Sequence, residues 1–160
     1  MEPHRQKLIF PIAVAITVLD QVSKMIVCAK FGAFDAVTVI PGFFDIRKVF
    51  NEGAAWGLFA GQRSFLVAIS IVMLFVLWFH RKEFSGKSLL CNIGIGLLAG
   101  GITGNLIDRV KLGYVVDFLD FHWKNSYTFP TFNVADSAIC IGVFLYFLYS
   151  VMNPEQKKPE

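Results

Sequence analysis

The sequence has little charge. Only 17% of its 160 residues are Asp, Glu, Lys or Arg, whereas 55% are hydrophobic and seventeen are Phe. A soluble domain typically carries ~25% charged residues, and so short a chain has too little interior to hide this much apolar surface. The composition excludes disordered, collagen-like and coiled-coil chains. It indicates one compact integral membrane domain over residues 1–160.

Two other features are scarce. No run of basic residues is longer than two, and the formal net charge is only +3. A nucleic-acid-binding domain needs a clustered basic face, so no nucleic-acid partner is expected. The three cysteines, Cys28, Cys91 and Cys140, lie in apolar stretches. Their spacing fits neither a zinc site nor a redox pair, and they are interpreted as small hydrophobic residues.

Apolar windows set the expected topology. A membrane-spanning helix needs about 20 mostly apolar residues, and the first window is interpreted as a retained helix because it lacks a clean cleavage site. Lys and Arg concentrate in the two tails and in the short middle loop, which predicts that both termini are cytoplasmic. The predicted helices are at about 8–29, 60–80, 88–107 and 135–152, and the outer segments at about 30–59 and 108–134.

The outer segments carry structure of their own. Residues 42–50 and 114–122 are rich in β-branched and aromatic residues, as strands are. Gly53–Phe59 mixes small residues with Trp56 and Phe59, which suits a helix lying in the membrane interface. The fold class predicted is an all-α membrane protein: four transmembrane helices with a small extracytoplasmic β-sheet and an interfacial helix.

Glycines recur in the third helix window. Gly96, Gly100 and Gly104 are four residues apart, with Gly101 beside them. This spacing predicts a bare ridge that lets another helix backbone approach closely. A phosphate-binding loop is excluded, because no strand precedes the glycines and no Lys-Ser/Thr follows them.

Polar residues at membrane depth are functional candidates, because each charge there costs at least ~2.5–3.5 kcal/mol. With the topology above, all of them fall near the outer interface. Asp108 and Arg109 could simply form an ion pair at headgroup level. The full set is Asp20, Lys24, Asn51, Asn105, Asp108, Arg109, Asp117, Asn133 and Asp136.

Structural explanations exist for several members of this set. Asp20 and Lys24 can pair across one helical turn. Asn133 and Asp136 have the spacing of a helix N-cap and its third residue, where a carboxylate is favourable. Asp117 is harder to explain in this way, because apolar residues flank it and no cation is adjacent.

The chemistry of two carboxylates fits this site best. Ser23 and Lys24 are neighbours on a helix and point in different directions, and the histidines never form a His-Glu-x-x-His zinc motif. Two carboxyls that share a desolvated site cannot both ionise, so the pair keeps one proton near neutral pH and titrates as a unit. An aspartyl hydrolase with Asp117 and Asp136 as its catalytic residues is predicted.

Five motifs occur in a characteristic order. They are Asp20-Gln-Val-Ser-Lys24, Asn51-Glu-Gly-Ala-Ala-Trp56, Gly100-Gly-Ile-Thr-Gly-Asn-Leu-Ile-Asp-Arg109, Val115-Val-Asp-Phe118 and Phe132-Asn-Val-Ala-Asp136. Together they make the chain resemble bacterial lipoprotein signal peptidase (signal peptidase II) over about residues 8–152. Two residues depart from the family pattern: Glu52, where the family usually has Thr or Arg, and Trp56, where it usually has Phe.

The resemblance implies a specific activity. The family removes signal peptides from diacylglyceryl-modified prolipoproteins, cutting on the amino side of the lipidated cysteine at the outer leaflet of the bacterial inner membrane. It binds the antibiotic globomycin and needs no metal or organic cofactor, and a monomer is expected. Its catalytic aspartates match Asp117 and Asp136.

The resemblance also extends to the surrounding residues. The polar residues that line the family's site match Asn51, Asn105, Arg109 and Asn133. We expect a structural or supporting role for Asp20, Lys24, Gly101 and Gly104.

Two other classes of function compete with a peptidase. A small transporter or proton-conducting subunit would suit acids and glycines within the membrane, but transport sites usually lie near the midplane between repeats, and the sequence has no repeat. A purely structural scaffold predicts that neutralising Asp117 stabilises the fold and costs no activity.

Overall fold

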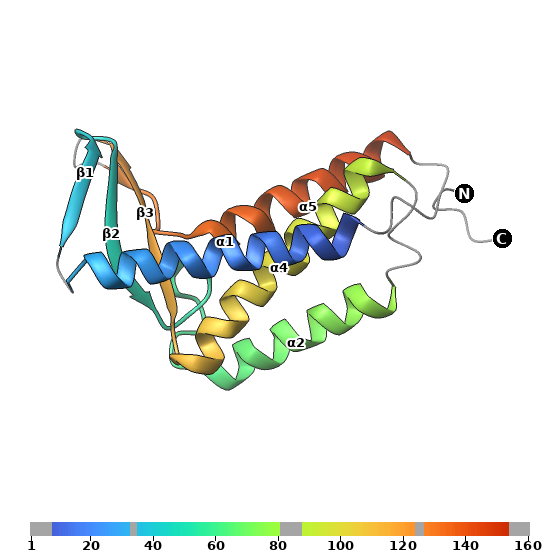
Figure 1. Cartoon of the computed structure of the whole chain (residues 1–160), viewed down its shortest axis with the longest axis horizontal. Coiled ribbons are helices and arrows are strands. Elements are labelled where there is room, and N and C mark those ends of the chain that lie inside the picture. Colours follow the sequence, from blue (N-terminus) through green and yellow to red (C-terminus); the bar gives the residue numbers. More distant parts are fainter. Residues whose placement is uncertain (1–7, 33–34, 81–87, 124–126, 154–160) are drawn as a thin grey trace.

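Among the residues that the structure describes, four α-helices and a small sheet make up the fold (Figure 1). The computed structural model describes residues 8–32, 35–80, 88–123 and 127–153. Three helices are long and apolar enough to cross a membrane, and a fourth apolar helix has 17 residues, so the chain is a multi-pass membrane protein. The helices are α1 (Ile9–Lys30), α2 (Arg63–Phe79), α4 (Leu89–Lys111) and α5 (Val134–Met152).

The helices follow the predicted windows closely, with one useful difference. α4 continues to Lys111, about one turn beyond the predicted end at residue 107. The extra turn places Arg109 and Lys111 near the helix C-terminus, where a positive charge interacts favourably with the helix dipole. As a result, Asp108 and Arg109 belong to the helix and project from it in different directions.

α4 is the central helix and packs against both α1 and α5 (Figure 1). A Cβ added at Gly100 would lie 2.7 Å from the carbonyl oxygen of Ala13 in α1. A Cβ at Gly101 would overlap the carbonyl oxygen of Ala135 in α5. Because no side chain fits at either position, the glycines let three helix backbones come together, as their spacing predicts.

The sheet is antiparallel, in the order β1-β2-β3-β4. It lies at one end of the helices, opposite the ends at which α1 begins and α5 finishes (Figure 1). The two long strands agree with the predictions for residues 42–50 and 114–122, whereas the first and last strands were not predicted. The strands are β1 (Ala36–Ile40), β2 (Phe44–Asn51), β3 (Val115–Trp123) and β4 (Tyr127–Thr128).

The predicted interfacial helix is much shorter than expected. Within Gly53–Phe59, only Ala55–Gly57 is helical, as a single 3₁₀ turn. Trp56 has φ 57° and Phe59 has φ 59°, values that an α-helix does not contain. The segment folds back on itself instead, because the Ala54 amide donates to the carbonyl oxygen of Leu58 at 2.7 Å.

Candidate active site

Asp117 and Asp136 approach the same asparagine from different elements. Asp117 is a buried residue of β3, and Asp136 lies in the first turn of α5. The side-chain amide of Asn133 donates to Asp117 Oδ1 at 2.7 Å, and the backbone amide of Asn133 donates to Asp136 Oδ2 at 3.2 Å. One residue therefore holds both carboxyl groups, although they are 19 positions apart in the sequence.

Asp136 has the capping role that its spacing predicts, together with a second partner. The Asp136 amide donates to Asn133 Oδ1 at 2.9 Å, which completes a capping box at the start of α5. Asn105 Nδ2 donates to the other carboxylate oxygen, Asp136 Oδ1, at 2.7 Å. Capping thus orients the Asp136 carboxyl and leaves it within the polar site.

Asp117 accepts a further hydrogen bond from the neighbouring strand. Asn51 Nδ2 donates to Asp117 Oδ2 at 2.9 Å, and Asn51 Oδ1 accepts from the Gly53 amide at 2.9 Å. Burial, reinforced by the negative charge of Asp136, raises the pKa of Asp117 to about 7, even though the hydrogen bonds from Asn51 and Asn133 favour the ionised form. A proton is therefore available on this carboxyl near neutral pH.

Two asparagines connect the carboxyl groups to the membrane helices. Asn105 Oδ1 accepts from Asn133 Nδ2 at 3.2 Å and from Lys24 Nζ at 3.0 Å. Since the amide oxygen of Asn105 is held by these two donors, its Nδ2 is directed at Asp136. Both asparagines are buried, so their hydrogen bonds fix the site geometry with little competition from water.

Lys24 lies at the centre of a buried charge network. Its ammonium is 2.9 Å from Asp20 Oδ2 and 2.9 Å from Asp108 Oδ2, and only 4% of its side chain is exposed. Gln21, which was not among the predicted site residues, donates to Asp108 Oδ1 at 2.9 Å. Asp108 therefore pairs with Lys24 of α1, rather than with its neighbour Arg109.

Asp20 supports the helix that carries Asp136. Its Oδ1 accepts from the Ala135 amide at 3.0 Å, so Asp20 holds one of the first amides of α5 from across the helix interface. A Cβ at Gly104 would lie 2.5 Å from Asp20 Oδ2. The absence of a side chain at Gly104 makes room for this carboxylate.

Arg109 reaches towards the loop that follows β2. Its Nη2 donates to the carbonyl oxygen of Gly53 at 2.9 Å, whereas its buried Nε has no hydrogen-bond partner. The charges of Asp136, Asp117 and Asp108 all act on the guanidinium. Arg109 thus connects α4 to the 53–59 loop and has a donor to spare.

All six residues predicted to act in catalysis or substrate binding are brought together here. The four predicted supporting residues form the layer beneath them, between α1, α4 and α5. Sequence reasoning missed Gln21, and it counted Asp108 among the polar candidates but gave Arg109 as its possible partner instead of Lys24. Their positions in the sequence could have indicated both roles. Gln21 lies in the Asp20–Lys24 motif, three residues before Lys24, and Asp108 lies in the Gly100–Arg109 motif, three residues after Asn105.

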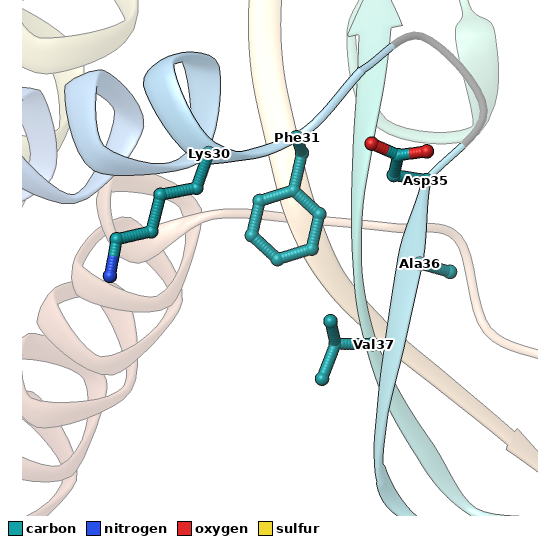
Figure 2. Close-up of a pocket in the computed structure, with 5 residues that line it drawn as sticks. All are labelled: Lys30, Phe31, Asp35, Ala36 and Val37. Carbon is teal, nitrogen blue, oxygen red and sulfur yellow. The ribbon is translucent and has the colours of Figure 1, made fainter.

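Two other polar features lie away from these carboxyl groups. A pocket between the end of α1 and β1 is lined by Lys30, Phe31, Asp35, Ala36 and Val37 (Figure 2). Within the described ranges, the group of Asp and His side chains that could hold a metal ion lies on the sheet and includes neither Asp117 nor Asp136.

Comparison with known proteins identifies the family. The model of the family Signal peptidase (SPase) II matches residues 12–152. The lipoprotein signal peptidase of Symbiobacterium thermophilum is 38% identical over 141 residues, which cover 88% of this chain and 92% of that protein. The lipoprotein signal peptidase of Staphylococcus carnosus is 39% identical over 158 residues, 98% of each chain.

Solved structures agree with this assignment. A bacterial membrane enzyme determined by the in meso method at 2.3 Å resolution superposes with a TM-score of 0.83 at 38% identity, covering 93% of this chain and 90% of that one. A second, determined by the same method at 1.9 Å resolution, gives a TM-score of 0.76 at 40% identity, with coverages of 86% and 88%. The resemblance noted in the five motifs is confirmed: the chain belongs to the signal peptidase II family and is a multi-pass membrane protease.

Proposed function

We propose that this protein is an intramembrane aspartyl endopeptidase that removes signal peptides from diacylglyceryl-modified bacterial prolipoproteins, cutting on the amino side of the lipidated cysteine. The observation that carries the proposal is the arrangement of Asp117 and Asp136 on the two sides of Asn133. Membership of a family whose relatives are named lipoprotein signal peptidases supports the substrate class.

The catalytic step requires one protonated and one ionised carboxyl. The ionised carboxyl takes a proton from a water molecule, and the water oxygen bonds to the carbon of the scissile carbonyl while the protonated carboxyl gives its proton to the carbonyl oxygen. The tetrahedral intermediate then breaks its C–N bond: the pair gives its proton to the departing nitrogen and takes one back from a hydroxyl of the intermediate, which forms the carboxylic acid product and leaves the pair with one proton again. The raised pKa of Asp117 supports a pair with one protonated and one ionised carboxyl, because it keeps a proton in the site near pH 7.

The neighbouring polar groups bind the substrate in this proposal. The spare donor of Arg109 and the remaining amide hydrogens of Asn51 and Asn105 are suited to the peptide carbonyls on either side of the scissile bond. Asn133 contributes to the substrate site by holding Asp117 and Asn105 in place, because its own amide already donates to both. Holding the peptide beside an activated water converts a bimolecular reaction into an effectively intramolecular one.

The proposed location is the bacterial inner membrane, with the site near the outer leaflet. Lys and Arg concentrate in the tails and the middle loop, which supports cytoplasmic termini. The sheet lies at the opposite end of the helices from the start of α1 and the end of α5 (Figure 1), as this orientation requires. The diacylglyceryl chains of the substrate would stay in the lipid, so the bilayer delivers the scissile bond to headgroup depth.

The proposal is tested with purified protein in lipid and a synthetic prolipoprotein, prepared with and without its diacylglyceryl group, by following the gel shift on cleavage. Asp117→Asn and Asp136→Asn should each abolish cleavage, whereas Asp35→Asn, a change at an exposed carboxylate, should leave the rate unchanged. Near-normal turnover in either of the first two variants would refute the aspartate pair.

Two further measurements address the substrate class and the oligomeric state. Only the lipidated substrate should be cleaved, and globomycin should block its cleavage. Equal cleavage of the unlipidated substrate would contradict the proposed specificity. A monomer is proposed as the active form, so the specific activity should not depend on protein concentration in the lipid.

A further inference from the structure

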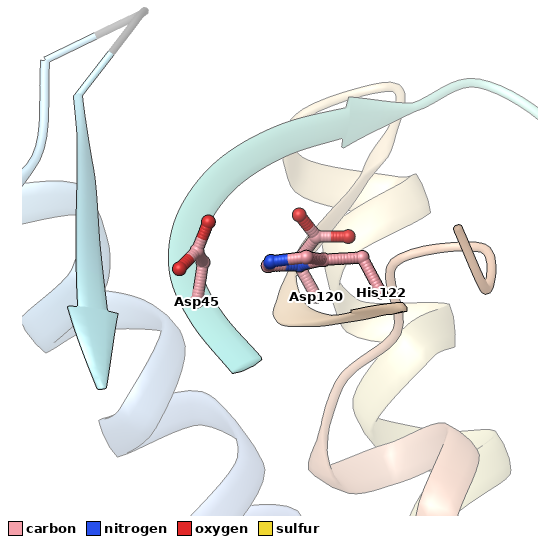
Figure 3. A group of neighbouring side chains, drawn as sticks. All are labelled: Asp45, Asp120 and His122. Carbon is pink, nitrogen blue, oxygen red and sulfur yellow. The ribbon is translucent and has the colours of Figure 1, made fainter. Parts of the chain in front are cut away.

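Three polar side chains converge on the sheet, away from the aspartate pair (Figure 3). Asp45 of β2 lies directly opposite Asp120 of β3, and His122 follows two residues later on β3. Successive residues of a strand point to opposite faces. His122 therefore shares a face with Asp120, whereas Asp117, three positions earlier, points to the other face.

Each of these side chains has a buried polar atom that lacks a hydrogen-bond partner. The atoms are Asp45 Oδ1, Asp120 Oδ1 and His122 Nδ1. Asp120 is only 1% exposed and directs its carboxylate into the cluster (Figure 3). Buried polar groups are almost always hydrogen-bonded, because leaving one without a partner is costly. Three such atoms at one place indicate that something is bound among them.

Arg47 compensates for part of this charge. Its Nε lies 2.8 Å from Asp120 Oδ2, and its side chain is 45% exposed. This contact neutralises one carboxylate through one oxygen and leaves Asp120 Oδ1 free to bind another group. A second carboxylate, Asp45, still faces Asp120 across the strands, and like charges in directly opposed positions destabilise a sheet.

We propose that Asp45, Asp120 and His122 bind a divalent transition-metal cation of the zinc type, as a structural site distinct from the proposed catalytic pair. One imidazole nitrogen and two carboxylate oxygens form a donor set that Zn²⁺ accepts, with the remaining position open to water. The potential ligand atoms lie within 4.8 Å of one another. Tetrahedral zinc separates its ligands by ~3.4 Å, so a small inward rotation of the side chains completes the site.

The contact between Arg47 and Asp120 is compatible with metal binding. Metal-ligating carboxylates commonly keep a hydrogen-bond partner on the oxygen that does not bind the metal. Asp120 can therefore use Oδ1 for the cation and keep Arg47 on Oδ2. The bound cation would fasten β2 to β3 three residues from Asp117, which adds stability to the strand that carries this aspartate.

The test uses the full-length protein in detergent, stripped with a chelator and then titrated with ZnCl₂. Bound zinc is measured by elemental analysis after desalting, and the unfolding temperature is measured in parallel. One equivalent of zinc should bind and should raise the unfolding temperature by several degrees, because a ligand that binds only the folded state stabilises it. His122→Gln and Asp45→Asn should each weaken binding at least tenfold.

Matched controls separate this site from other zinc ligands. His80→Gln and Asp35→Asn change the same residue types elsewhere and should bind zinc as the unchanged protein does. Titration with Co²⁺ should give a visible d–d spectrum without a thiolate charge-transfer band, which excludes the cysteines as ligands. These readouts do not depend on peptidase activity, so they can fail or succeed independently of the proposed function.

Specific outcomes would overturn the proposal. It fails if the stripped protein takes up no zinc, if His122→Gln binds zinc as tightly as the unchanged protein, or if the cobalt complex shows a thiolate band. A variant that does not fold is replaced by Asp45→Glu, which keeps the donor type and should retain binding with altered affinity. Loss of zinc uptake in His80→Gln would equally refute the assignment.

Discussion

Replacing Asp117 by Asn should change how the stability of the protein depends on pH. Folding raises the pKa of Asp117 from 3.8 to about 7, so the folded state binds this proton more tightly than the unfolded state. The carboxyl therefore costs no stability below pH 3.8. The cost grows as the pH rises from there and is complete above about pH 7.

The size of the effect follows from the shift. A change of one pKa unit corresponds to about 1.4 kcal/mol, so ionised Asp117 costs the folded state about 4 kcal/mol at high pH. Between pH 5 and pH 8 this cost increases by about 2–3 kcal/mol. Asn carries no charge and avoids that increase. It also leaves one of the amide donors of Asn51 and Asn133 unmatched, which costs about 1–3 kcal/mol at every pH.

The measurement is thermal unfolding of both proteins in detergent at pH 5 and pH 8. Relative to the unchanged protein, Asp117→Asn should gain roughly 5–10 °C in unfolding temperature on going from pH 5 to pH 8. Asp35→Asn, at an exposed carboxylate, should keep the pH dependence of the unchanged protein. If the difference between Asp117→Asn and the unchanged protein is the same at both pH values, the reasoning about burial is wrong.

Three further predictions concern the network around the pair. Lys24→Met leaves two buried carboxylates without their cation and should lower the free energy of unfolding by about 3–5 kcal/mol. In the same chemical denaturation series, Lys30→Met at the exposed end of α1 should change it by less than about 0.5 kcal/mol, and equal losses in the two variants would contradict the network. Arg109→Lys loses the planar donor that reaches the Gly53 carbonyl and should lower kcat/KM about tenfold without changing the unfolding temperature. An unchanged kcat/KM would make Arg109 an anchor to lipid headgroups. Gly101→Ala forces a methyl group against α5 and should lower the free energy of unfolding by about 1–3 kcal/mol. An unchanged unfolding temperature would show that α4 and α5 can separate freely.

The sequence predicted which polar side chains the structure brings together, because these residues are conspicuous. A carboxylate such as Asp117 among valines and phenylalanines is unusual enough to be noticed without a structure. Local spacing was also sufficient where partners are close along the chain, as for the capping pair Asn133 and Asp136. Short exposed elements were harder to predict: β1 was not predicted, and the helix expected within residues 53–59 is a single 3₁₀ turn at Ala55–Gly57. The conformation of β1 depends on its pairing with β2, and that of residues 53–59 depends on positive φ angles at Trp56 and Phe59. Amino-acid composition predicts neither feature strongly.

Composition and periodicity by themselves determined that the chain enters a membrane, where its helices run, which of them pack closely and which side chains are out of place there. Only the tertiary structure decided what those side chains touch. Asp20 holds the amide of Ala135 from 115 positions away, Lys24 pairs with Asp108 of α4 as well as with Asp20, and the β2–β3 register places Asp45 opposite Asp120, close to His122. The physical reason is that hydrophobic patterns fix which face of an element is buried, whereas hydrogen bonds and ion pairs reach only about 3 Å and depend on how distant elements dock.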